Sequence, residues 1–345
     1  MSPVIRFGAG ARAHLADVCA EVGIERPLLV TTRRGAASAP GLPVVAVYDG
    51  VLPHVPVETV DDAYRLATEH AVDGLVGLGG GSAVDTAKAV AARLVADRAG
   101  RSRESGCAVI AMPTTYAGAE WTPYFGLLLA PGRKGGGVDE RVRPAGAVYD
   151  PELTLELPLR ATVGTAMNAL AHCAEAYYAP GADDRAAPAA DTGAALIAAA
   201  LPHVVREPGS LEGRSRLLEG AMHAALALGF SGLCLAHAMA QGLGGHFGLP
   251  QGAMNAICLP AALRFNVEAV PDAIARFAAA LGTDDAPARC AELAALGGFR
   301  RLRDEGVPEH ELAEVAAAIT ERPGTRANPR PVAAADVERL LREVW

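Results

Sequence analysis

The stretch at residues 73–88 constrains the fold more than any other part of the chain. It opens with a short apolar run, Leu75, Val76 and Leu78, in which no polar residue alternates with the apolar ones. Such a run is typical of a strand buried on both faces, as in a parallel sheet. Three glycines follow at once, at 79–81, and apolar residues then recur at helical spacing. The stretch therefore predicts a strand, a tight turn and a helix.

The predicted turn is a candidate site for a phosphate group. Glycines leave backbone N–H groups uncovered, and the N-terminal end of a helix favours a negative charge. Ser82 is expected to cap this helix, and Asp85 to complete a capping-box pair with it. The motif is neither GxGxxG nor GxxxxGKS/T, so the usual dinucleotide and P-loop fingerprints are absent. A tight turn that binds nothing is the alternative interpretation.

The composition indicates a folded protein with a large core. The 345 residues are 51% hydrophobic and 20% charged, which excludes a disordered chain. A net charge of −8 and the lack of Lys/Arg-rich runs argue against a nucleic-acid partner. The six cysteines are scattered, no signal-peptide pattern opens the sequence, and no apolar run is long enough to span a membrane. We therefore expect a cytoplasmic protein with reduced thiols.

Strand and helix patterns alternate through residues 1–158, which predicts βαβ units and a parallel, Rossmann-like sheet. The expected strands lie at 4–7, 26–32, 44–48, 74–78, 107–112, 124–129 and 146–149. A mobile glycine-rich segment, 132–137, is expected to join the last two. The hydroxyl-rich loop 113–123 follows a strand, so it can face the same ligand as the glycine turn, because ligands bind at the carboxyl ends of parallel strands.

Alanine-rich helical patterns replace strands from residue 159 onward, which predicts an all-α second domain at 159–345. The expected helices lie at 162–179, 186–205, 212–228, 231–247, 253–264, 270–281, 286–304, 308–321 and 334–344. The Pro-rich run 322–331 is expected to be a surface loop before the last helix.

Three histidines lie in this half within otherwise apolar segments: His172, His237 and His246. Asn168 shares a helix face with His172, and Gln241 shares one with His237, because each pair is four residues apart. Each histidine by itself is best explained as a core residue whose ring is hydrogen-bonded to a neighbour. Only the three together suggest a catalytic site.

The ordered motifs GGGSAVDTAKA, PTTYAGAEWTP, YDPELTLELP, MNALAHCAEAYYA and LAHAMAQGLGGHFGLPQGAMNA resemble those of the iron-containing (group III) alcohol dehydrogenases, most closely the maleylacetate reductases. The resemblance covers essentially the whole chain. It implies a nucleotide-binding α/β domain, a fold shared with dehydroquinate synthase, a helical domain and an active site in the cleft. It also implies that Gly79, Gly80, Gly81 and Ser82 bind the NAD(P) pyrophosphate, with Thr114, Thr115 and Lys134 on the rest of the cofactor.

The resemblance maps the metal ligands of metal-binding members, one Asp and three His, onto Asn168, His172, His237 and Gln251. Only two of the four survive, and amides are weak ligands for iron or zinc, so we predict no catalytic metal. Asn at 168 is itself typical of maleylacetate reductases, but those enzymes keep histidines where this chain has Gln241 and Gln251. Gln cannot exchange a proton at neutral pH, and His246 is a candidate substitute.

Cofactor choice between NADPH and NADH is left open. The strand ending at Thr32 lacks the acid that binds a ribose 2′-OH, whereas Arg33 and Arg34 could accept a 2′-phosphate or form a solvated turn. The predicted site residues fall into three groups. The catalytic candidates are His172, His237, Tyr116 and His246; the cofactor-binding candidates are Gly79, Gly80, Gly81, Ser82, Asp85, Thr114, Thr115, Lys134 and Thr32; the substrate-binding candidates are Asn168, Gln241, Gln251 and Trp121.

The favoured function is an NAD(P)H-dependent, metal-independent reductase of a small carbonyl, a maleylacetate-like keto or enol acid. Without a metal, hydrogen-bond donors must stabilise the developing alkoxide. The missing histidines motivate an alternative, a non-redox lyase, cyclase or isomerase on the same scaffold. A binding subunit without turnover is a third interpretation, which the intact glycine turn disfavours. The resemblance also implies a homodimer paired through N-terminal strands.

Overall fold

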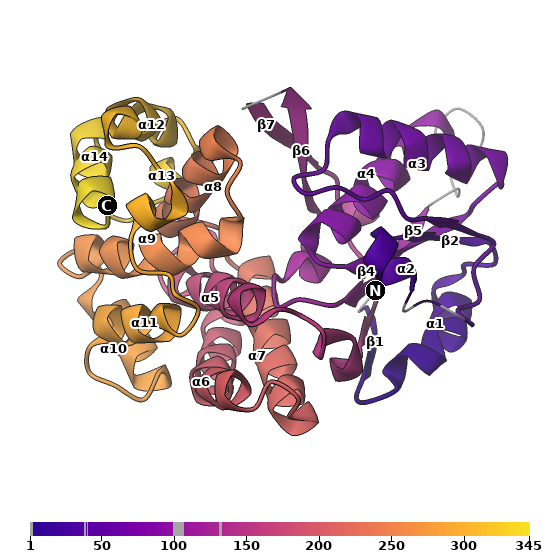
Figure 1. The fold of residues 1–345 in the computed structure, drawn as a ribbon, viewed down its shortest axis with the longest axis horizontal. Helices are drawn as coiled ribbons and strands as arrows, with labels where there is room; N and C mark the ends of the chain where they lie inside the picture. Colours follow the sequence, from indigo (N-terminus) through magenta and orange to yellow (C-terminus); the bar gives the residue numbers. More distant parts are fainter. Residues whose placement is uncertain (1–2, 38, 40, 99–106, 131–132) are drawn as a thin grey trace. The chain divides into compact units, whose positions relative to one another are not determined.

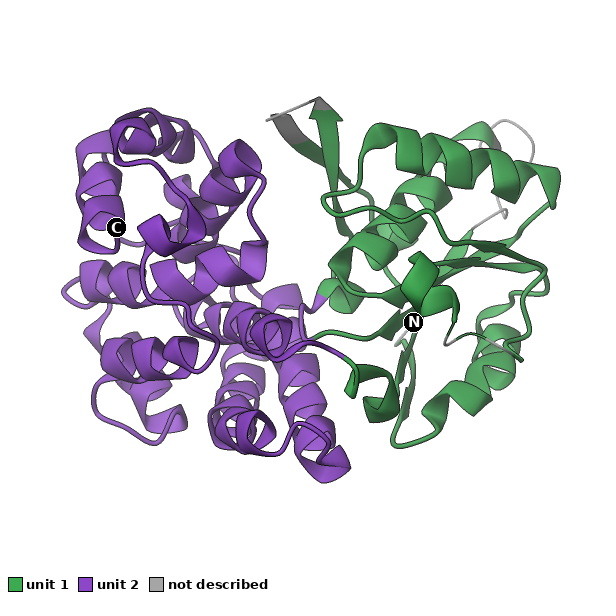
Figure 2. Cartoon of the chain, viewed as in Figure 1, with its two compact units in different colours: residues 1–115, 119–156 green, residues 116–118, 157–345 purple. Residues whose placement is uncertain are grey.

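The computed structural model describes residues 3–37, 39, 41–98, 107–130 and 133–345, and Figure 1 shows its elements. The chain forms two compact units (Figure 2). Unit 1 comprises residues 1–115 and 119–156, and unit 2 comprises residues 116–118 and 157–345. The chain thus enters unit 2 for three residues, returns to unit 1 and crosses again at 156/157.

A six-stranded parallel sheet organises unit 1, which confirms the expected fold of this half. The strands lie in the order β1-β8-β5-β4-β2-β3. Their bounds are β1 Val4–Phe7, β2 Pro27–Val30, β3 Ala46–Tyr48, β4 Gly74–Gly79, β5 Ala108–Pro113 and β8 Gly146–Tyr149. Every residue of β2, β4 and β8 is buried, as expected for strands covered on both faces.

Alternate side chains of each central strand point to opposite faces of the sheet and pack in two separate hydrophobic cores. Leu75 of β4 packs with α3 and α4 on one face of the sheet, whereas Val76 and Leu78 pack with α1 on the other. The helices of this unit are α1 Leu15–Val22, α2 Arg33–Ala36, α3 Val57–Glu69 and α4 Gly81–Arg98, and its 3₁₀ turns are η1 Ala11–His14, η2 Ala119–Trp121, η3 Glu140–Val142 and η4 Pro151–Thr154. Two-sided packing explains the unbroken apolar runs in the sequence.

The predicted glycine-rich connection at 132–137 is wrong, because residues 133–138 form a strand. β6 (Tyr124–Ala130) and β7 (Arg133–Val138) pair as an antiparallel hairpin. A Cβ on Gly136 would lie 2.3 Å from the carbonyl oxygen of Phe125, so the glycine permits close approach of the two strands. Lys134, a predicted cofactor contact, lies in β7, and its side chain falls outside the described part of the structure.

Unit 2 is built from helices, which confirms the all-α half. They are α5 Leu159–Ala176, α6 Ala186–Arg206, α7 Leu211–Gly229, α8 Leu235–Phe247, α9 Gln251–Asn266, α10 Pro271–Ala280, α11 Ala286–Ala295, α12 Leu312–Thr320, α13 Pro323–Arg326 and α14 Ala334–Glu343, with 3₁₀ turns η5 Leu302–Glu305 and η6 Glu309–Glu311.

Two predictions for this unit need correction. The helix expected at 286–304 ends at Ala295, and Gly298 follows at φ 77°. The expected surface loop 322–331 contains α13 and buries Thr325 and Asn328.

Helix α6 is long and apolar enough to cross a membrane by length and composition alone. Its buried residues instead recur at helical spacing and include Gly193, which faces α7. A Cβ on Gly193 would lie 2.9 Å from the backbone nitrogen of Ala224. This close packing against α7 is the behaviour of a core helix.

Arg214, on α7, is fully buried and bonds to neutral oxygens. Its guanidinium donates to the phenolic oxygen of Tyr116 (3.3 Å), Oγ1 of Thr162 (2.9 Å) and the carbonyl oxygens of Leu157 (3.4 Å) and Pro208 (3.1 Å). Tyr116 and Leu157 are the first residues of unit 2 after two of the chain crossings. Arg214 therefore holds the chain segments at both crossings against α7 of the helical unit.

We expect Arg214→Ala to lower the free energy of unfolding of unit 2 by about 3 kcal/mol or more, because it leaves a cavity and buried acceptors without a donor. Arg216→Ala is the matched control: Arg216 lies on the same helix, exposed and paired with Glu212, where a change of under about 0.5 kcal/mol is expected. Urea denaturation followed by circular dichroism measures both. Equal losses in the two variants would contradict the anchoring role.

Candidate functional site

The turn between β4 and α4 requires glycine at position 79. Gly79 has φ 152°, and a Cβ there would lie 2.8 Å from the Cβ of Ala83. A Cβ on Gly81 would meet nothing within 4 Å, so the space beside this residue is open. The protein thus leaves no room for a side chain at Gly79, whereas the space next to Gly81 is free for a ligand.

Helix α4 begins at Gly81, one residue before the predicted cap. The N–H groups of Ala83 and Val84 donate to the carbonyl of Gly80, while those of Gly81 and Ser82 have no acceptor among the described residues. Two N–H groups at a helix N-terminus, next to open space, fit a phosphate oxygen.

The predicted capping box between Ser82 and Asp85 is wrong. Asp85 Oδ2 instead accepts from the backbone N–H of Gly126 at 3.0 Å, and Oδ1 lies 3.6 Å from Nζ of Lys88. Burial raises the pKa of the Asp85 carboxyl, and the Lys88 charge opposes that shift. Asp85 therefore links α4 to the β6–β7 hairpin, and its contact with a cofactor stays a prediction.

The two threonines after β5 lie beside the glycine turn. The N–H of Thr114 donates to the carbonyl of Gly79 at 3.0 Å, and a Cβ on Gly80 would lie 3.0 Å from Cγ2 of Thr115. The parallel register of β4 and β5 brings these chain segments to one edge of the sheet. The structure thus brings together Thr114, Thr115 and the turn at 79–82, which the sequence predicted as cofactor contacts.

Three other residues of unit 1 that were considered for cofactor or substrate contact form hydrogen bonds within the unit. Thr32 caps α2 by accepting from the N–H of Gly35, and Arg34 donates to the carbonyl of Glu156 at 2.7 Å. Arg33 is exposed. The indole N–H of Trp121, a predicted substrate contact, donates to the hydroxyl of Tyr149 at 2.6 Å.

In unit 2 the structure brings His172 of α5 and His237 of α8 into contact. Their rings stack with centroids 4.7 Å apart and planes 9° apart, and both side chains are buried, at 3% and 0% exposure. Burial and the neighbouring ring hold the pKa of His172 well below its usual range, so this imidazole is neutral. His172 Nδ1 and His237 Nε2 find no hydrogen-bond partner among the described residues.

Glu175 orients His237, and sequence reasoning missed it. One carboxylate oxygen lies 2.7 Å from Nδ1 of His237 and accepts from the N–H of Cys234, while the other accepts from the N–H of His237. A carboxylate on Nδ1 fixes that nitrogen as the donor and leaves Nε2 free for chemistry. The available signal was a glutamate in the otherwise apolar helix after His172.

Two buried amides complete the cluster. Asn168 Nδ2 donates to the carbonyl of Ala117 at 3.0 Å and lies 3.3 Å from Nε2 of His172. Asn255 Nδ2 donates to Asn168 Oδ1 at 2.6 Å. Asn255 was also missed, although it lies four residues after Gln251 on the same helix face.

The remaining predicted site residues lie outside this contact network. Gln241 and Gln251 lie one helical turn from His237 and Asn255, respectively, and both are partly exposed. His246 lies nine residues beyond His237 on α8, about 14 Å along the helix, and binds Glu311 at 2.8 Å. Tyr116 is fully buried, with its hydroxyl on Arg214.

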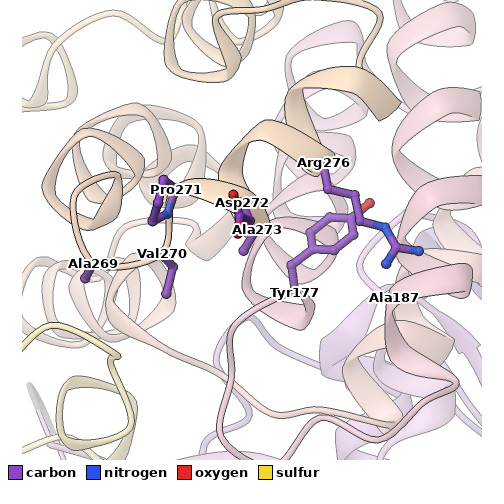
Figure 3. Close-up of a pocket in the computed structure, with 8 residues that line it drawn as sticks. All are labelled: Tyr177, Ala187, Ala269, Val270, Pro271, Asp272, Ala273 and Arg276. Carbon is purple, nitrogen blue, oxygen red and sulfur yellow. The ribbon is translucent and has the colours of Figure 1, made fainter.

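A shallow depression of about 470 Å³ lies elsewhere in unit 2, around α10 (Figure 3). Tyr177 and Arg276 line it, and both bond to Asp191. None of the predicted site residues lines it.

The residues present at the His172–His237 cluster do not fit iron or zinc. The mapped positions offer two imidazoles and two amides, and the nearby Glu175 carboxylate already serves His237 and two backbone N–H groups. Within the described ranges, no three His, Cys, Asp or Glu side chains gather in a group that could hold a metal ion. The glycine turn, in contrast, has the backbone N–H groups and the open space that suit a phosphate group.

Comparison with known families covers nearly the whole chain. A model described as iron-containing alcohol dehydrogenase matches residues 2–151, and one for the C-terminal part of the Fe-containing alcohol dehydrogenase family matches residues 162–345. Maleylacetate reductase of Pseudomonas knackmussii is 36% identical over 352 residues, which cover 100% of this chain and 96% of that protein. Maleylacetate reductase of Sphingobium indicum is 35% identical, covering 97% and 93%.

Solved structures show the same fold. Maleylacetate reductase from Agrobacterium tumefaciens matches with a TM-score of 0.89 at 31% identity, covering 100% of this chain and 96% of that one. An iron-containing alcohol dehydrogenase from Corynebacterium glutamicum matches with a TM-score of 0.89 at 34% identity, covering 100% and 95%. The chain therefore belongs to the iron-containing alcohol dehydrogenase family, lies close to its maleylacetate reductases, and is an NAD(P)-dependent oxidoreductase.

Proposed function

We propose that this enzyme reduces a small, maleylacetate-like keto or enol acid with NAD(P)H and without a catalytic metal. The observation that carries the proposal is the buried His172–His237 pair, which leaves one nitrogen of each ring without a partner in the described structure. The similarity to maleylacetate reductases supports the substrate class.

The glycine turn is the proposed binding site for the cofactor pyrophosphate. The N–H groups of Gly81 and Ser82 would donate to phosphate oxygens, and the N-terminal end of α4 would favour their charge. Thr114 and Thr115 adjoin the turn and would contact the rest of the cofactor. When bound, the dinucleotide supplies the hydride.

The two imidazoles are proposed to act on the substrate oxygen. As charge develops there, a nearby N–H donor stabilises it, which is the task of the metal ion in metal-dependent relatives. His237 would deliver a proton to that oxygen from Nε2 when its ring is protonated, and Glu175 on Nδ1 would hold the neutral ring that remains. His172 contributes a neutral ring whose second nitrogen faces Asn168.

Metal independence is proposed from the donor set. Asn168 presents an amide nitrogen, not a carboxylate oxygen, toward His172 Nε2. An N–H donor in that direction repels a cation where a carboxylate would bind one.

Replacing His237 tests this function. His237→Asn keeps an amide nitrogen near the Nδ1 position for Glu175 but removes Nε2, so the fold is preserved and turnover should fall by roughly 10²–10⁴. His310→Asn is the control, because His310 is 84% exposed on η6. NADPH or NADH oxidation with maleylacetate, read at 340 nm, measures both. Equal turnover in the two variants would remove His237 from the site, and failure of wild-type protein to bind either dinucleotide in calorimetry would favour a non-redox reaction.

A further inference from the structure

We infer that Asn168 is a positioning residue that fixes the proton of His172 on Nδ1. The inference concerns the free protein, and only its catalytic consequence rests on the proposed function. The observation is a chain of directed hydrogen bonds, all within unit 2, that runs from Ala117 and Asn255 through Asn168 to His172.

The orientation of the Asn168 amide is set from two sides. The carbonyl of Ala117 only accepts hydrogen bonds, so the group 3.0 Å from it must be the NH₂ of Asn168. Asn255 then donates to Asn168 Oδ1 at 2.6 Å, which fixes its own amide as well. Reversing Asn168 would set its oxygen against the Ala117 carbonyl and its NH₂ against that of Asn255. Both buried contacts would become repulsive.

The Asn168 NH₂ determines the tautomer of His172. It lies 3.3 Å from Nε2, and because it has no lone pair to offer, Nε2 must accept. A neutral imidazole that accepts at Nε2 carries its proton on Nδ1. The ring stacks on His237, and it lies so close to Gly118 that a Cβ there would be 3.3 Å from His172 Nδ1.

The two stacked rings are therefore not equivalent. His172 offers an Nδ1–H donor, whereas His237 has its Nδ1 on Glu175 and its Nε2 without a partner. In the proposed reductase, His172 is thus a fixed donor and His237 the ring that exchanges a proton. An aspartate at 168 would remove this distinction, because its carboxylate accepts from Nε2–H.

Histidine-selective ¹⁵N labelling tests the assignment, because two-bond ¹H–¹⁵N correlations separate the two tautomers of a neutral ring. The sample is the full chain without cofactor, at pH 8 with a chelator, and the His172 signals are assigned by their loss in His172→Gln. Wild type should show the proton on Nδ1, and Asn168→Asp should move it to Nε2. Asn266→Asp is the control. Asn266 lies at the end of α9 and forms a separate buried amide pair with Asn328, so this variant should leave the tautomer of His172 unchanged.

A wild-type ring protonated on Nε2, or the same tautomer in wild type and Asn168→Asp, would overturn the inference. The activity readout separates this result from the proposed function. Asn168→Asp should lower kcat roughly 100-fold, as expected for loss of one aligned donor, with the KM for the cofactor unchanged. A shifted tautomer with unaltered kcat would keep the positioning role and refute the proposed donor role of His172.

Discussion

Gly81→Asp is expected to weaken dinucleotide binding roughly 100-fold without unfolding the protein. A side chain at 81 enters open space, since a Cβ there meets nothing within 4 Å, and a carboxylate in the first turn of α4 favours the helix. Facing a phosphate at about 5 Å with an effective dielectric of about 20, the new charge costs about 3 kcal/mol of binding. Calorimetric titration with NADPH and NADH measures the loss.

Gly81→Ala is the matched control for this prediction. It adds the same Cβ without the charge and should change affinity by less than the aspartate does, because the space is open. If both variants bind dinucleotide as wild type does, the phosphate does not lie at residues 79–82. Thermal unfolding of each variant distinguishes lost affinity from lost fold.

The double variant Asn168→Asp/Gln251→His is expected to gain a metal site. It restores the Asp and three His that the family resemblance assigns to metal-binding members, beside the existing His172 and His237. Gln251 lies four residues before Asn255, which bonds to Asn168, so residue 251 shares the α9 face that is turned toward α5. After dialysis against Zn²⁺, elemental analysis should give close to one metal per chain, against far less in wild type.

Asn168→Asp/Gln241→His controls for simple addition of charge and imidazole. It introduces the same residue types but places the histidine on α8, at the position related to proton exchange or substrate contact rather than metal binding. It should bind metal more weakly than the first double variant. Stoichiometric metal in wild-type protein would show that two imidazoles and two amides suffice, and would refute the proposed metal independence.

Sequence reasoning recovered the elements whose pattern is local. β4, the glycine turn and α4 were predictable because a buried strand, a bend and a helix each leave a signature within a few residues. β7 was missed because consecutive glycines have low strand propensity, and only the pairing with β6 makes them a strand. The sequence also contained no sign that residues 116–118 belong to unit 2. Their place there depends on a hydrogen bond from Arg214 to the Tyr116 hydroxyl, which joins residues 98 positions apart.

The candidate site divides in the same way. His172 and His237 stand out in apolar helices, so they were found from the sequence. Asn255 was not, because its role comes from the register of α9 against α5, which joins residues 87 positions apart. Tyr116 and Trp121 were chosen for their chemistry, yet their polar atoms are bonded to Arg214 and Tyr149. The local sequence pattern shows which polar residues stand in apolar segments. Tertiary packing decides which of them keep polar atoms free to contact a substrate.

The most direct test of the account is turnover and metal content measured on the same purified sample. Cofactor oxidation at 340 nm with maleylacetate is followed before and after treatment with a chelator, and iron and zinc are quantified in each fraction. We expect steady turnover at well below one metal per chain, unchanged by the chelator. Turnover that disappears with the chelator and returns in proportion to added Fe²⁺ or Zn²⁺ would contradict it.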